Sequence, residues 1–204
     1  MKNLFKAAAV VATVMGFMCV QRGRGAPQTT PSSPTDDINA FREQAMPAWS
    51  GNLERTTEWR ACARVIDPWH PETRICLSKS YGGHVSAEYV AAQGAKLSDQ
   101  FLKLREAFPS VALSALVSRL SITTYAISRP SRAIDQLAAE LEHLEVSFDL
   151  PNVMSMDQPR YELELQTQYD SGLRLVLVNA PPNHPIVAWI RHATEVLATA
   201  SRGR

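Results

Sequence analysis

The first 25 residues have the pattern of an export signal, and this pattern sets the chemical environment in which the rest of the chain folds. Lys2 and Lys6 give a positive start, and the uncharged run from Ala7 to Val20 is rich in Ala, Val and Met. The run has the length of a signal-peptide core and is short for a membrane span. We predict that residues 1–25 are a signal peptide removed before Ala26. The remaining chain is then periplasmic or secreted, in a compartment where cysteines are oxidised.

Two other fates of the N-terminus stay open. Cys19 suggests lipidation, although Met18 stands where a lipoprotein signal has a small residue. Alternatively, the apolar run remains as an uncleaved anchor, since Arg22 and Arg24 follow it and leave little charge bias across it. Contact with a membrane is expected only through such an N-terminus.

Only two cysteines remain after the signal, Cys62 and Cys76. In an oxidising compartment an even pair of this kind predicts one disulfide bond. Closing a loop of this length stabilises a fold by about 3 kcal/mol in the chain-entropy model. The alternative is a free, reactive cysteine with His70 or His84 as its base, but no local catalytic signature surrounds either cysteine.

The charge balance of the exported chain argues against nucleic acid as a partner. The first 25 residues hold four of the 21 basic side chains and none of the 20 acidic ones, which leaves 17 basic against 20 acidic. A net charge of about −3 lacks the basic excess that displaces counterions from phosphates. We therefore predict no binding to nucleic acid.

The composition divides the exported chain into a tether and a domain. Residues 26–37 contain three prolines and almost no apolar side chains, which predicts a disordered tether. Residues 38–204 fit a single domain. The fold class that we predict for it is α+β, an antiparallel sheet with three to four helices packed on it and one disulfide-stapled hairpin near the N-terminus.

Residues 59–77 fit either a helix or a hairpin, and we favour the hairpin. If Cys62 faces Cys76 across an antiparallel pair, Ala63 falls opposite Ile75 and Ala61 opposite Leu77, which gives one apolar face. The turn-forming segment 67–71 then closes the loop. The other face carries the disulfide together with three arginines, namely Arg60, Arg64 and Arg74.

Patterns of apolar residues predict the remaining elements. Apolar residues spaced three and four positions apart predict a helix from Ser86 to Phe108, ended by Pro109. The same apolar stripe also fits a coiled-coil seam, which is the less favoured interpretation. Shorter helical patterns cover residues 113–120 and 134–141, while β-prone or alternating patterns cover 122–127 and 144–150.

The C-terminal part predicts a second hairpin and a last helix. The hairpin joins 161–167 to 173–178 and is centred on Ser171, with residues 170–172 as its loop. The helix is expected to have Asn183 as its cap and Pro185 in its first turn. Its inward positions are Ile186, Ile190, Ala193 and Leu197.

No catalytic, metal-binding or phosphate-binding motif occurs in the sequence. The histidines are scattered, and neither a serine-nucleophile motif nor a glycine-rich phosphate loop is present. The nearest approach to a metal or acid–base site is the group Asp67, His70 and Glu72, for which a solvated loop is the favoured interpretation. We predict no metal site and no cofactor.

These observations favour a binding protein over an enzyme. The predicted function is an exported protein-binding module, either an envelope-assembly accessory or an inhibitor of an envelope-acting enzyme, and its partner is another protein in the cell envelope. Aromatic and arginine side chains dominate such interfaces. The candidate binding residues are Arg60, Arg64, Trp69, Arg74 and Tyr81, with Trp49 as a further aromatic candidate. The alternative is a small periplasmic hydrolase whose site assembles in three dimensions from His70, His84 and Glu72 near the disulfide loop.

Overall fold

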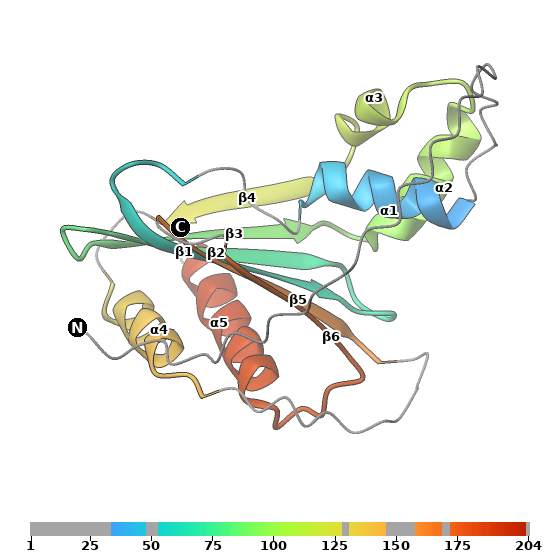
Figure 1. The fold of residues 1–204 in the computed structure, drawn as a ribbon. Helices are drawn as coiled ribbons and strands as arrows, with labels where there is room; N and C mark the ends of the chain where they lie inside the picture. Colours follow the sequence, from blue (N-terminus) through green and yellow to red (C-terminus); the bar gives the residue numbers. More distant parts are fainter. Residues whose placement is uncertain (1–33, 48–52, 128–130, 146–157, 169–171, 203–204) are drawn as a thin grey trace, which may run out of the picture. The chain divides into compact units, whose positions relative to one another are not determined.

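The computed structural model describes residues 34–47, 53–127, 131–145, 158–168 and 172–202 (Figure 1). The predicted signal peptide, residues 26–33 of the tether, and Trp49 lie outside the described residues. Of the strand expected over 144–150, residues 146–150 also lie outside the described residues.

The centre of the fold is a six-stranded sheet in the order β4-β3-β2-β1-β5-β6. Every neighbouring pair is antiparallel. The strands are β1 (Thr57–Ile66), β2 (Thr73–Ser80), β3 (Val85–Ala92), β4 (Ile122–Ile127), β5 (Arg160–Thr167) and β6 (Leu173–Val178).

Five helices are described, and with this sheet they establish the α+β class, although the expectation was three to four helices. They are α1 (Pro34–Ala45), α2 (Leu97–Ala107), α3 (Leu113–Val117), α4 (Arg132–Glu142) and α5 (Pro185–Arg202). In Figure 1, α4 and α5 lie on one side of the sheet and α1 to α3 on the other. Within the described ranges, no helix has both the length and the apolarity to cross a membrane.

The pairing of β1 with β2 matches the register expected from the sequence. Cys62 lies opposite Cys76 and Ala63 opposite Ile75. The two cysteines form a disulfide, with their Cα atoms 4.1 Å apart. The bond joins directly opposed residues of two neighbouring strands, so it fixes the alignment of these strands.

The helix predicted from Ser86 to Phe108 is wrong over its first half. Residues 85–92 form β3, in which Val85, Ala87 and Tyr89 alternate toward the core. Gly94 has a φ of +72°, a backbone conformation that glycine adopts freely and that ends the strand. The helix begins only at Leu97, whose backbone N–H donates to the carboxylate of Glu72 at 2.6 Å.

Helix α1 begins at Pro34, within the last part of the segment that the sequence assigned to the tether. Residues 34–37, assigned to the tether from their composition, therefore start a helix. The helix is held by burial of Phe41, which contacts Phe101 of α2 with 4.8 Å between ring centroids, and by Met46 just beyond its end. These contacts are tertiary, and a low local content of apolar residues does not reveal them.

The second hairpin has the predicted faces but a different register. Leu165 pairs with Leu173 and Leu163 with Leu175, so the pairing is centred on residue 169 rather than on Ser171. Because the shift is an even number of residues, each side chain keeps its face. Residues 169–171 of the connection lie outside the described part.

The last two helices build most of the core with one face of the sheet. The four predicted inward positions of α5 are all fully buried. The helix begins at Pro185, so His184 rather than Asn183 precedes it, and the Ala188 N–H donates to the His184 carbonyl at 2.9 Å. His184 therefore lies at the N-terminal end of the helix, and its side chain is buried.

Glu142 at the end of α4 ties this helix to the sheet. Its carboxylate accepts hydrogen bonds from Lys79 Nζ and from Trp59 Nε1, the latter at 3.0 Å. The hydrogen bond from Lys79 lowers the pKa of Glu142 below its usual value of 4.5, although partial burial acts in the opposite direction. Because the folded-state pKa is lowered, this contact stabilises the fold above pH 4.5 and is lost as the pH falls through the folded-state value.

We expect Glu142→Gln to reduce the free energy of unfolding by up to about 1 kcal/mol at pH 7, since the side chain remains partly exposed. At pH 3 a larger fraction of the wild-type carboxyl is protonated than at pH 7, and the difference should be smaller. Urea unfolding at both pH values measures this. Glu106→Gln, at an exposed position of α2, is the control and should have little effect at either pH. A Glu142→Gln effect of equal size at both pH values would contradict the assigned ion pair.

Candidate functional site

The sheet face opposite α4 and α5 is polar and is divided into a covered and an open half. Cross-strand neighbours place Val90, Arg74, Arg64 and Glu162 in one row across it. Helices α1 to α3 pack over one end, where Met46, Val90, Ala92 and Leu97 form a small apolar cluster. The other end carries the disulfide, Arg60 and Ser78, and we call it the open face.

Arg64 belongs to the covered half and is engaged within the fold. Its side chain bonds Glu162 of β5, with 2.8 Å between Arg64 Nε and Glu162 Oε2, and donates to the Met46 carbonyl at 2.7 Å. It also forms an ion pair with Glu43 of α1. Arg64 and Glu162 are only 2 % and 1 % exposed. The structure thus places this predicted binding residue beneath α1, where it joins α1 to the sheet.

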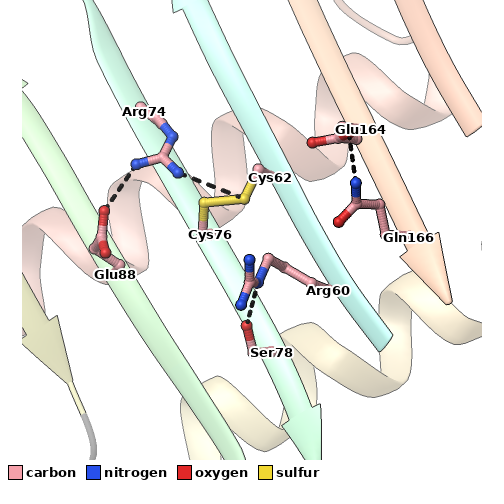
Figure 2. The surroundings of a disulfide bond; sticks show 8 residues. All are labelled: Arg60, Cys62, Arg74, Cys76, Ser78, Glu88, Glu164 and Gln166. Atoms are coloured by element: carbon pink, nitrogen blue, oxygen red, sulfur yellow. Dashed lines mark hydrogen bonds and ion pairs between the residues drawn. A yellow bond between two sulfur atoms is a disulfide. The ribbon is translucent and has the colours of Figure 1, made fainter. Parts of the chain in front are cut away.

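Arg60 and Arg74 lie on the open face, on either side of the disulfide (Figure 2). Arg74 Nη1 donates to Glu88 of β3 at 2.8 Å, and its Nη2 lies 3.8 Å from Cys62 Sγ. Arg60 Nε has a long contact of 3.4 Å with Ser78 Oγ on β2. The register positions these groups, because Cys76 faces both Cys62 and Glu88 while Ser78 faces Arg60.

These side chains line a hollow of about 410 Å³ on the open face. Its polar lining comes from three neighbouring strands, and Ala126 and Ile127 of the edge strand β4 form one wall. The polar and charged lining residues are Arg60, Arg74, Ser78, Ser86 and Glu88.

The ion pairs of the open face leave one arginine without a carboxylate. Arg74 pairs with Glu88, and Arg174 of β6 pairs with the buried Glu164 at 3.4 Å. Among the residues that the structure describes, Arg60 has no ion-pair partner, and Ser78 is its hydrogen-bond partner. The hollow therefore holds an uncompensated positive charge, which favours an anionic group.

The two aromatic candidates are exposed but lie at opposite ends of β2. Trp69 is in the β1–β2 loop and is 70 % exposed. Tyr81 is in the β2–β3 turn, and its hydroxyl donates to Gln168. Tyr81 follows β2 at the end nearer Ser78, whereas Trp69 lies at the end covered by α1 and α2. The structure thus brings Arg60 and Arg74 together and leaves Trp69 apart from them.

The residues considered for an acid–base site are also separated. His70 forms an exposed pair with Asp67, 3.1 Å from Nδ1 to Oδ2, while His84 lies beyond the other end of β2. Glu72 is buried and bonds both Leu97 N and Arg42. Within the described ranges, no three His, Cys, Asp or Glu side chains are placed to hold a metal ion.

Sequence reasoning missed Ser86 and Glu88, because it assigned them to a helix. The alternation in Val85-Ser-Ala-Glu-Tyr89 is the signal that indicates a strand, with Ser86 and Glu88 on the polar face. Ala126 was also missed, since its contribution to the hollow depends on the pairing of β3 with β4.

Comparison with known proteins gives no match: no family model, no curated protein and no solved structure is similar to this chain.

For Arg64, we expect substitution to affect stability rather than surface recognition. Arg64→Ala leaves the buried Glu162 with Arg160, at 2.7 Å, as its remaining cation. It should reduce the free energy of unfolding by about 3 kcal/mol, the lower end of the range for a broken buried ion pair. The double variant Arg64→Met, Glu162→Leu removes both charges and should lose less. Urea unfolding of both variants tests this, with Arg191→Ala, on the exposed side of α5, as a control near zero. A neutral Arg64→Ala variant would contradict a structural role.

Proposed function

We propose that this chain is an exported protein-binding module that uses the open face to bind another protein of the cell envelope. Its role would be that of an envelope-assembly accessory or an inhibitor of an envelope-acting enzyme, in the periplasm or outside the cell. The observation that carries the proposal is Arg60, which lies in a 410 Å³ hollow without an ion-pair partner among the described residues.

The construction of the open face supports a binding role. Its side chains stand on paired strands, and the disulfide joins two of these strands between Arg60 and Arg74. A surface held in this way loses little conformational entropy when a partner binds. Arginine is also a frequent hot-spot residue, since its planar guanidinium makes several hydrogen bonds at once.

The edge strand β6 supports a protein rather than a small molecule as the partner. Three of its six side chains are apolar and more than 40 % exposed, namely Leu173, Val176 and Val178. Val176 and Val178 lie on the polar face of the sheet. Edge strands of this kind are usually protected or paired, because they present free backbone groups beside apolar side chains. A partner that extends across the polar face would reach this edge.

The hydrolase alternative has less support from the described residues. His70 and His84 flank opposite ends of β2, and Glu72 is bound to the first amide of α2. None of these three lines the hollow. An acid–base mechanism needs such groups within hydrogen-bond reach of one reacting centre.

The proposal is tested by affinity capture of the full-length, tagged protein exported in its native host. We expect a defined envelope protein to co-purify with the wild type. Arg60→Gln should reduce its recovery at least about tenfold, because one charge-assisted hydrogen bond contributes about 1.5–3 kcal/mol.

Arg191→Gln is the matched control, since it removes an exposed arginine from α5 on the opposite side of the sheet. Unfolding curves of both variants establish that they fold like the wild type. If no protein is enriched, or if the two variants lower recovery equally, the proposal is wrong.

A further inference from the structure

We infer that the hollow on the open face binds one carboxylate, supplied by an Asp or Glu side chain in an extended segment of the partner protein. This inference rests on the proposed function and adds the chemistry that the open face recognises. It depends on the charges, the hydrogen-bond donors and the size of the hollow.

The charge inside the hollow matches a monoanion. Its charged lining residues are Arg60, Arg74 and Glu88. Glu88 pairs with Arg74 at 2.8 Å, and this leaves the positive charge of Arg60 to be compensated. One carboxylate completes the balance. A phosphate dianion would instead leave an excess negative charge beside Glu88, so the carboxylate is favoured over phosphate.

The available donors also suit a carboxylate. Arg60 uses only Nε in the contacts of the described residues, so both of its terminal nitrogens keep donors for a two-pronged contact with two carboxylate oxygens. Ser78 accepts a hydrogen from Arg60 and retains its own O–H as a donor. Arg74 Nη2 is directed to a sulfur, which is a weak acceptor, and it therefore keeps donating capacity.

The size and position of the hollow favour an acidic side chain carried by a peptide. A volume of about 410 Å³ exceeds that of one carboxylate and admits the methylene stem behind it. The hollow extends to the edge strand β4, where Ala126 is small and exposed. The disulfide provides an apolar surface between the arginines, and lower local polarity strengthens a charged hydrogen bond.

The test uses small probes and the exported, disulfide-bonded protein. The Nε–Hε NMR signals of Arg60 and Arg74 are followed during titration with acetyl-Ala-Glu-Ala-amide, its Gln analogue, acetyl-Ala-Ala-Ala with a free carboxyl end, and inorganic phosphate. We expect the Glu peptide to shift both signals in a saturable way, with an affinity at least about tenfold higher than that of the Gln peptide. Arg60→Gln should abolish saturation of the Arg74 signal, and Arg191→Gln should preserve it.

Three results would overturn the inference. They are a Gln peptide that binds as tightly as the Glu peptide, phosphate that saturates the signals at equal or lower concentration, and binding of the peptide with the free carboxyl end when the Glu peptide does not bind. Failure here is distinguishable from failure of the proposed function. If Arg60→Gln abolishes partner capture while the Glu peptide does not bind, a protein-binding face remains and its carboxylate chemistry is wrong. If the peptide binds while capture is unaffected, the carboxylate site remains and the proposed function is wrong.

Discussion

The alignment of β1 with its two neighbours is the constraint on which the rest of the structure depends. On one side, the disulfide joins Cys62 to Cys76 of β2. On the other, Arg64 bonds Glu162 directly opposite it on β5. A slip by one residue would move every side chain of β1 to the other face and place its arginines against the apolar core. One covalent and one ionic cross-strand contact therefore keep all these arginines on the polar face.

Helices cover only part of the polar face, and this gives Arg60 and Arg64 different roles. Arg60 and Arg64 are four residues apart on the same face of β1. Helix α1 covers Arg64 and supplies Glu43 as a partner, and the Met46 carbonyl just after the helix supplies another. Arg60 instead contacts Ser78 in an open hollow. Because Arg64 is buried, it connects α1 to the sheet. Because Arg60 is not covered by a helix, it keeps hydrogen-bond donors that a partner can use.

Particular residues show what the sequence could and could not predict. The hairpin around Cys62 and Cys76 was predictable, because the cysteines and the apolar alternation agree on one register. β3 was mistaken for the start of α2, because its apolar residues also fit helical spacing and Gly94 was not treated as a break. The separation of Arg60 from Arg64 was beyond local patterns, since it depends on where α1 packs. Arg60 and Arg74 were predicted together, while Ser86, Glu88 and Ala126 became visible only through strand pairing.

Site-specific photo-cross-linking of the full-length protein, expressed in its native host, tests most directly the central proposal that the open face binds a partner protein. A photoreactive phenylalanine analogue replaces either Ala126, an exposed residue at the wall of the hollow, or Ala188, an exposed residue of α5. We predict one discrete adduct with an envelope protein from position 126, lost when Arg60→Gln is added, and none from position 188. Equal cross-linking from both positions, or an adduct from position 126 that is independent of Arg60, would contradict the claim.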